Sequence, residues 1–292
     1  MITAKLSSPG TLQVLLVLGR VSNLPTVWSN CLAAWLLAGG GSLQKFTLLC
    51  SGASLLYTGG MFLNDAFDVD FDRQYRQERP IISGRISARK VWLGAAVLLL
   101  LGWLVIAPLG KLALIAASLL LGAIVIYDAV HKHTALAPLL MAACRFLLYM
   151  VAASAAREGV RAPVVASASA LAAYIVGLSY LARKESTSSV ATSWSSPLLF
   201  APIAAALLRG PLDRLVLWLA AIAEGGWVFW CLGGRTAPPK GGLSRGVAGL
   251  LAGIVLVDWL AATAGPSDVW LSVAFIGLFV MALLSQRFAP AT

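Results

Sequence analysis

Long apolar segments recur along almost the whole of this 292-residue chain. A helix needs about 20 mostly apolar residues to cross the hydrocarbon core of a bilayer, and nine segments approach or exceed that length. A further apolar segment, at 195–208, is short for a crossing on its own. The nine segments lie at residues 11–38, 46–63, 90–109, 111–128, 135–156, 163–182, 213–232, 245–264 and 268–286.

The composition agrees with a chain that lies mostly in lipid. Hydrophobic residues make up 59% of the sequence and charged residues 12%, whereas soluble domains average about 45–50% and about 25%. Because backbone groups within a bilayer must be satisfied internally, the segments are expected to be helices. The sequence therefore predicts an all-α, polytopic transmembrane bundle of nine or ten helices, forming a single domain over residues 1–292.

The positive charges predict how this bundle is oriented. The formal net charge is +10, from 22 Lys and Arg against 12 Asp and Glu. If the amino terminus is cytoplasmic, most of these cations fall on the side that carries residues 64–90, as the positive-inside bias requires. We therefore expect a multi-pass membrane protein with this region facing the cytoplasm. Membrane topology accounts for the basic balance without a nucleic-acid partner.

The stretch NDAFDVDFDRQYRQERP, residues 64–80, places acids and arginines directly after an apolar segment. If the helix continues through residue 72, its 100° spacing brings four side chains to one face, and Asp70 to another. Stacked carboxylates repel one another unless a cation lies among them, and hard oxygen ligands favour Mg²⁺. An acidic cap is the alternative, although acids are unfavourable at a helix carboxyl terminus. The candidate metal ligands are Asn64, Asp65, Asp68 and Asp72.

Basic residues follow these acids. Arginines beside a Mg²⁺ site suit a diphosphate, which they grip through two hydrogen bonds at once. Arg73 and Arg79 are the candidates for this contact. Topology alone is the alternative reading for them, and it is the preferred reading for the other cations of the loop.

These motifs resemble the UbiA-type intramembrane prenyltransferases. NDAFDVDFD is similar to the family pattern N-D-x-x-D-x-x-x-D, and RQERPIISGRIS to its R-P-x-x-S-G-R stretch. GRVSNLPTVWSN near the start and YDAVHKHTALAP in the middle of the chain extend the similarity over roughly residues 15–185.

The resemblance implies a nine-helix bundle around a polar cavity and a Mg²⁺-dependent transfer of an isoprenyl group. The donor would be an isoprenyl diphosphate, the acceptor a small aromatic or polar molecule, and pyrophosphate would leave at the cytoplasmic side. Asp68 and Asp72 would hold the catalytic metal, Lys132 would grip the diphosphate, and Asn23 would face the cavity. Tyr180 is a candidate to line the cavity and shield a carbocation.

One departure from the family lies in GLSYLARKESTSS, residues 177–189. The family's second acidic motif is missing there, and Leu181 stands where its first aspartate is expected. One interpretation is that Arg183 and Lys184 supply the positive charge of a second metal and contact the substrate. The alternative is a catalytically degenerate protein that binds or transports a lipid or small metabolite. Proteins of an EboC-like subgroup, which occur in bacteria, share this pattern. The resemblance therefore implies a location in a bacterial inner membrane.

Other charges lie within apolar segments. An unpaired charge such as Arg145 would cost at least about 2.5–3.5 kcal/mol at the centre of a membrane helix. We therefore expect Arg145 to pair with an acid, for which Asp258 and Glu224 are candidates, or to face the cavity. Asp128 is expected to orient Lys132.

Overall fold

The computed structural model describes residues 10–187, 193–233, 242–265 and 269–287. The regular elements in these ranges are all helices. They are α1 (Thr11–Leu18), η1 (Val21–Asn23), α2 (Leu24–Leu37), α3 (Leu43–Phe67), α4 (Val69–Tyr75), α5 (Ala88–Ile106), η2 (Ala107–Leu109), α6 (Lys111–Val130), α7 (Ala137–Ala155), α8 (Ala162–Thr187), η3 (Ser193–Phe200), α9 (Ala201–Arg209), α10 (Leu215–Gly233), α11 (Gly242–Ala262) and α12 (Val269–Ser285).

The all-helical class is confirmed, and each predicted apolar segment coincides with helix. Within the described ranges, six helices are long and apolar enough to cross a membrane: α3, α5 with η2, α6, α7, α8 and α10. Three shorter apolar helices accompany them, namely η3 with α9, α11 and α12. The short segment at 195–208 is therefore helical as well.

The expectation of one continuous helix over residues 11–38 is wrong. The chain breaks between α1 and α2, where Arg20 adopts a left-handed conformation with φ 42°. Pro25 lies in the first turn of α2, where its missing N–H leaves no hydrogen bond unmade. This break turns Arg20 away from a regular helical position, and its side chain reaches the acidic motif described below.

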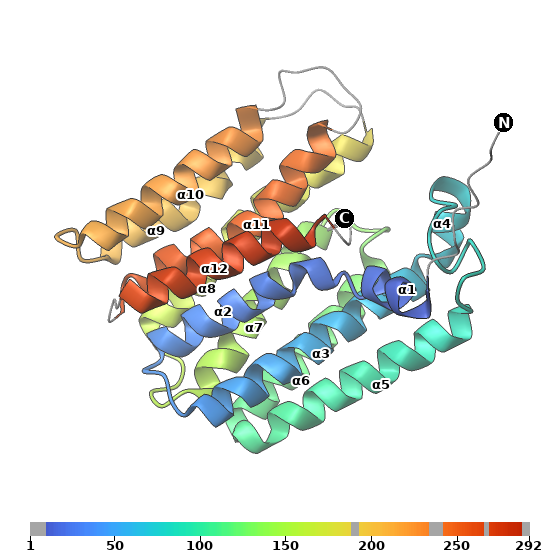
Figure 1. The fold of residues 1–292 in the computed structure, drawn as a ribbon, viewed down its shortest axis with the longest axis horizontal. Coiled ribbons are helices and arrows are strands. Elements are labelled where there is room, and N and C mark those ends of the chain that lie inside the picture. Colours follow the sequence, from blue (N-terminus) through green and yellow to red (C-terminus); the bar gives the residue numbers. More distant parts are fainter. Residues whose placement is uncertain (1–9, 188–192, 234–241, 266–268, 288–292) are drawn as a thin grey trace.

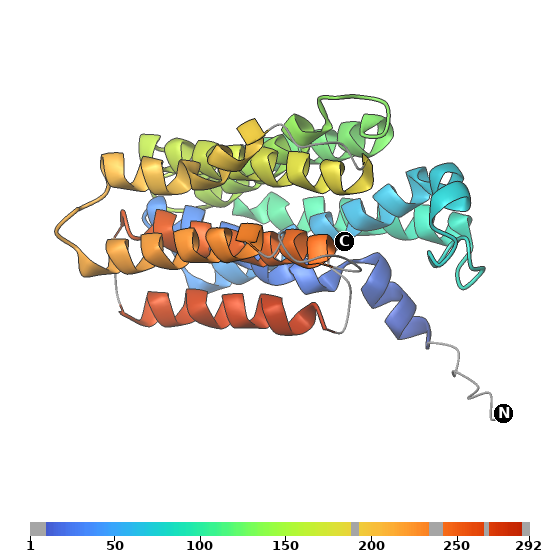
Figure 2. The same ribbon diagram turned by 90° about the horizontal axis from the view of Figure 1, so that it is seen from above.

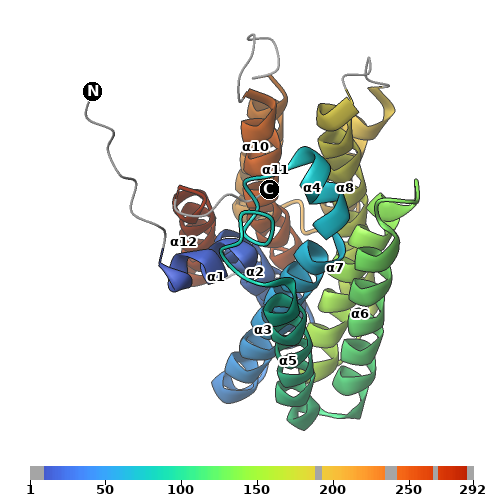
Figure 3. The same cartoon turned by 90° about the vertical axis from the view of Figure 1, so that its right-hand side faces the viewer.

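The helices run side by side along one direction, and α4 lies at one end of the bundle (Figure 1). Seen from above, α12 lies at one face, and α7 and α8 lie towards the opposite face (Figure 2). Between them, α11 packs against α2, α8, α10 and α12. Viewed from the end that carries it, α4 crosses the ends of the longer helices (Figure 3).

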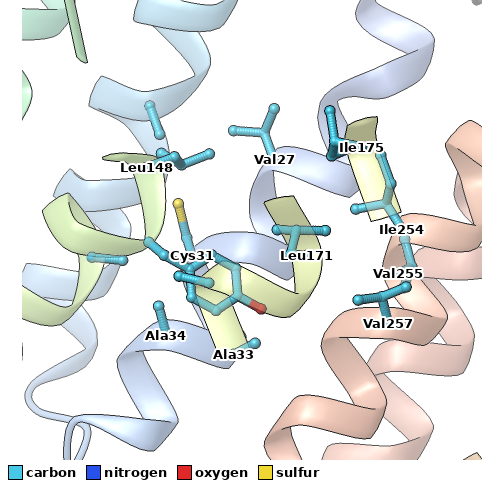
Figure 4. Close-up of a cluster of buried hydrophobic side chains, with 14 of the residues drawn as sticks. Val27, Cys31, Ala33, Ala34, Leu148, Leu171, Ile175, Ile254, Val255 and Val257 are labelled. Atoms are coloured by element: carbon cyan, nitrogen blue, oxygen red, sulfur yellow. The ribbon is translucent and has the colours of Figure 1, made fainter. Parts of the chain in front are cut away.

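A buried apolar cluster joins α2, α7, α8 and α11 (Figure 4). Val27 and Cys31 of α2 lie between Leu148 of α7 and the α8 pair Leu171 and Ile175. Burial of a large aliphatic side chain contributes about 1.5–3 kcal/mol when the reference is water. Within lipid, close packing replaces much of that driving force. The cluster holds these four helices together on one side of the cavity.

Candidate functional site

A cavity of about 500 Å³ opens among α2, α3, α6, α7, α8 and α11. Its polar wall includes Asn64 and Asp68 at the end near α4, and Tyr57 and Arg145 further along the bundle. Tyr57 precedes Asn64 by two helical turns in α3, which separates their backbones by about 10 Å. The cavity thus has an acidic end and a deeper, mostly apolar part.

The acidic motif turns its ligand candidates inward. Asn64, Asp65, Asp68 and Asp72 are all at most 6% exposed, whereas the Asp70 side chain is 92% exposed. This division follows the helical spacing that the sequence predicts. The predicted continuous helix through residue 72 is nevertheless wrong, because Asp68 (φ −81°, ψ 2°) separates α3 from α4. The backbone N–H of Asp72 donates to the carbonyl of Asp68, so Asp68 caps the start of α4.

Cationic side chains from distant segments pair with these acids. Asp65 lies 3.5 Å from Arg20 and 3.4 Å from Arg79. Asp68 lies 3.0 Å from the Lys132 ammonium and 3.4 Å from His131 Nε2. The acidic end of the cavity is therefore surrounded by cations that a diphosphate would also attract.

Asn64 is held from both sides. Its Oδ1 accepts a hydrogen bond from Arg20 at 3.3 Å, and its Nδ2 donates to Asp128 Oδ1 at 3.1 Å. Asp128 was expected to orient Lys132. Instead, Asp128 accepts from Asn64, and Lys132 pairs with Asp68. The ammonium of Lys132 also lies 4.0 Å above the ring of Phe71, an arrangement that favours a fixed position of the charge.

Burial and charge act in opposite directions on these groups. Burial raises the pKa of Asp68, but the hydrogen bonds and charges of His131 and Lys132 outweigh it and bring the pKa below its ordinary value. Burial raises the pKa of Asp72 despite the nearby charge of Arg79. Burial, with the repulsion of Arg20, lowers the pKa of Arg79. Asp68 is thus the acid whose ionised form is best supported by its surroundings.

The predicted substrate contacts divide into three groups. Asn23, Arg79, Lys132 and Arg183 line the cavity. Arg73 does not line it: its side chain is 66% exposed and donates to Asp70 at 3.1 Å. Tyr180 is partly buried but is not among the residues of the cavity wall. The side chain of Lys184 lies outside the described residues.

Three further side chains line the acidic end without being among the predicted site residues: Arg20, Arg76 and His131. Asp128 lines it as well, where only a role beside Lys132 was expected. Arg20 lies within GRVSNLPTVWSN, one of the stretches that carry the family resemblance. A cation inside an apolar segment is costly, and that cost was the available signal.

At the position of the missing second acidic motif, Leu181 is buried. Arg183 donates to the carbonyls of His131 at 3.1 Å, Thr134 at 2.8 Å and Ala135 at 3.3 Å. It therefore ties α8 to the connection between α6 and α7, in addition to lining the cavity.

The oxygen donors at the acidic end fit Mg²⁺ bound together with a diphosphate. Asp72 Oδ1 and Asp128 Oδ2 are buried without a hydrogen-bond partner among the described residues, and each would gain from a cation or its bound water. Within the same ranges, no three His, Cys, Asp or Glu residues form a ready-made metal cluster. This agrees with the usual habit of Mg²⁺, which takes one or two carboxylates and completes its shell with water and substrate phosphate.

Among the described residues, Arg145 reaches an acid through an intermediate residue. It donates to Thr26 Oγ1 at 3.0 Å and to Asn30 Oδ1 at 2.7 Å, and Asn30 Nδ2 in turn donates to Asp258 at 2.7 Å. The expected Arg145–acid pair is thus bridged by Asn30, while Arg145 also lines the cavity. The other candidate, Glu224, is fully buried, and neither carboxyl oxygen has a partner in the described part of the chain.

Comparison with known proteins identifies a family pattern over most of the chain. Residues 23–239 match the UbiA prenyltransferase family. The 4-hydroxybenzoate octaprenyltransferase of Cupriavidus pinatubonensis is 36% identical over 95 residues, which is 32% of this chain and 33% of the relative. The enzyme of the same name from Polynucleobacter asymbioticus is 37% identical over 92 residues, 30% of this chain and 32% of the relative. These matches therefore span about a third of the length of the curated relatives.

Solved structures share the fold over nearly the full length. A structure described as digeranylgeranylglyceryl phosphate synthase superposes with a TM-score of 0.62 at 19% identity, covering 87% of this chain and 98% of that one. A UbiA homologue from Archaeoglobus fulgidus bound to DMAPP and Mg²⁺ gives a TM-score of 0.54 at 15% identity, covering 94% and 97%. Six long apolar helices in the described ranges, together with the family match, make this chain an integral membrane protein.

Proposed function

Because the chain belongs to the UbiA prenyltransferase family, we propose that it transfers an isoprenyl group from a polyprenyl diphosphate to a small acceptor. The observation that carries this proposal is the acidic end of the cavity, where Asn64 and Asp68 lie among the cations Arg79 and Lys132. This pairing of hard oxygen ligands with cations suits a Mg²⁺-bound diphosphate.

In the proposed reaction the chain binds the diphosphate and stabilises its departure. Mg²⁺, held by Asn64, Asp68 and Asp72 with support from Asp65, would neutralise charge on the leaving pyrophosphate. Lys132 and Arg79 donate to the phosphate oxygens, and these charge-assisted contacts strengthen as the allylic C–O bond breaks. Arg183 adds a further cation at the cavity wall.

The mostly apolar remainder of the cavity suits an isoprenyl chain and a small acceptor. The relatives named above act on 4-hydroxybenzoate, and an aromatic acceptor of this kind is one candidate. The altered second motif, which makes the chain similar to the EboC-like subgroup, keeps a non-aromatic polar acceptor as the other.

A second candidate function is binding or transport of a lipid without chemistry. It is favoured by one observation, the buried Leu181 at the position where the family carries an aspartate. The two candidates differ in whether pyrophosphate is released.

The deciding experiment measures pyrophosphate release by the purified full-length protein. Geranylgeranyl diphosphate and Mg²⁺ are supplied with 4-hydroxybenzoate in one series and a bacterial metabolite extract in another. We expect release, together with a prenylated product detected by mass spectrometry. Asp68→Ala and Asp72→Ala should abolish both signals.

Asp70→Ala is the matched control, because Asp70 belongs to the same motif but has a 92% exposed side chain. It should retain the wild-type rate. Mg²⁺-dependent donor binding with no release in any series would favour the second candidate. Neither binding nor release, across several donor lengths, would overturn the prenyltransferase proposal.

We further propose that the acidic end of the cavity faces the cytoplasm, as the positive charges predict. Cysteine substitutions at two exposed positions, Gln77→Cys and Val160→Cys, test this orientation. A membrane-impermeant maleimide added to intact spheroplasts should label the cysteine at position 160 and should reach position 77 only after permeabilisation. The reverse pattern would contradict the orientation.

A further inference from the structure

We propose that Asp128 of α6 is an additional acid of the metal–diphosphate site and that its negative charge contributes to Mg²⁺ affinity. This inference rests on the proposed function and deepens it. It concerns a residue outside the acidic motif of residues 64–72, on a different helix. The observation behind it is a buried carboxyl oxygen without a partner.

Asp128 belongs to the acidic end of the cavity by position. It is 3% exposed and lines the cavity together with Asn64 and Asp68. Its Oδ1 accepts the hydrogen bond from Asn64 Nδ2 at 3.1 Å. Its Oδ2 is buried and has no hydrogen-bond partner among the described residues.

Two acids of the motif are already paired with basic side chains. Asp65 is paired with Arg20 and Arg79, and Asp68 with Lys132 and His131. No side-chain cation lies within salt-bridge distance of Asp128 in the described ranges. A buried carboxylate without a paired cation has an unfavourable desolvation free energy. A divalent cation or its bound water would offset that free energy.

The hydrogen bond between Asn64 and Asp128 also fixes the orientation of Asn64, a candidate metal ligand. With its Nδ2 held by Asp128, Asn64 presents its Oδ1 to the other side, where Arg20 donates to it. Asp128 therefore both orients a metal-ligand candidate and brings a negative charge next to it. This acid comes from α6, whereas α8 carries the buried Leu181 and the cation Arg183 at the place of the family's second motif.

The test measures metal binding without turnover. Full-length protein in detergent is titrated with Mn²⁺ in the presence of geranylgeranyl thiolodiphosphate, an unreactive donor analogue, and free Mn²⁺ is followed by electron paramagnetic resonance. Asp128→Asn keeps an oxygen that accepts from Asn64 but removes the charge. We expect it to weaken Mn²⁺ binding about tenfold, at the lower end of the effects seen for residues that support metal ligands.

The Mn²⁺ affinity of Asp128→Asn is compared with those of other variants and of the wild type. Asp68→Asn should weaken binding more strongly, and the exposed control Asp70→Asn should bind as the wild type does. If Asp128→Asn binds normally while Asp128→Ala does not, Asp128 only orients Asn64 and the inference is overturned. If Asp128→Asn and Asp128→Ala both bind normally, the inference also fails while the proposed function stands. If the wild type itself binds no Mn²⁺, the proposed function fails.

Circular dichroism at the titration temperature checks that each variant is folded. Should Asp128→Asn lose its helical signal, Asp128→Glu and Asp128→Gln make the same comparison with matched side-chain size. The charged variant should then bind Mn²⁺ more tightly than the neutral one. Equal affinities of these two variants would overturn the inference.

Discussion

Acidic residues at the end of the cavity near α4 pair with cations that lie far away in the sequence. Arg79 and Arg73 are six residues apart, yet Arg79 reaches the buried Asp65 and Arg73 the exposed Asp70. Lys132 comes from the connection after α6 and meets Asp68 at 3.0 Å. The position of each cation relative to the cavity, rather than its place in the motif, decides whether it pairs with a buried acid.

Lys132→Met tests whether the charge of Lys132 contributes to binding of the donor diphosphate. Removing a charge-assisted hydrogen bond costs about 1.5–3 kcal/mol, so affinity for the donor diphosphate should fall about tenfold to a hundredfold. Equilibrium binding of the thiolodiphosphate analogue measures the change. Lys111→Met, at the exposed opposite end of α6, is the control and should bind normally. Equal affinities of the two variants would remove Lys132 from the diphosphate site.

Helices α3 and α5 approach each other closely at two glycines. A Cβ atom at Gly102 would lie 2.8 Å from the backbone N of Leu56 and 2.9 Å from the carbonyl oxygen of Gly52. Small residues at such crossings let backbones come together in lipid. Because α3 carries Asn64 and Asp65, this contact also holds the acidic motif in position.

Gly102→Ala should therefore destabilise the protein, since the new methyl group meets backbone that cannot move aside. Overpacking of this kind costs about 1–3 kcal/mol, and the melting temperature in detergent should fall. Gly122→Ala is the matched control on α6, where a Cβ meets nothing within 4 Å. It should be neutral or slightly stabilising, because alanine favours helix over glycine. Similar melting temperatures for both variants would contradict the packing argument.

Across the whole molecule, a buried polar network joins helices that are distant in sequence. Asp258 of α11 accepts hydrogen bonds from Ser29 and Asn30 of α2 and from Tyr149 of α7. Asn30 also accepts from Arg145, so the network extends to the cavity wall. The three helices of the network, α2, α7 and α11, are also joined by the apolar cluster of Figure 4, which includes α8 as well.

Asp258→Ala would leave three buried donors without their acceptor. Unsatisfied buried groups cost about 1–3 kcal/mol each, so the variant should lose at least about 2 kcal/mol of stability. Thermal unfolding in detergent, followed by circular dichroism, measures this loss. Asp213→Ala, at an exposed position, should unfold like the wild type. A melting temperature for Asp258→Ala equal to that of Asp213→Ala would show that the network adds nothing to stability.

Much of the fold was predictable because lipid imposes a simple rule. Apolar segments of about 20 residues become helices when no water can satisfy their backbones, and this placed the predicted segments correctly. The break at Arg20 was not predictable in this way, since it depends on a left-handed residue whose side chain is held by Asn64 and Asp65. Hydropathy contains no information about such a contact.

The candidate site was likewise predictable only in part. Helical spacing predicted that Asn64, Asp65, Asp68 and Asp72 turn inward and Asp70 outward, because a period of 3.6 residues acts within a few turns of chain. The partners of these side chains come from α6, from the α6–α7 connection and from the break before α2. Pairings over such distances depend on how the helices pack, and no local spacing encodes them. Asp128 therefore emerged as a neighbour of Asn64 only in the folded chain.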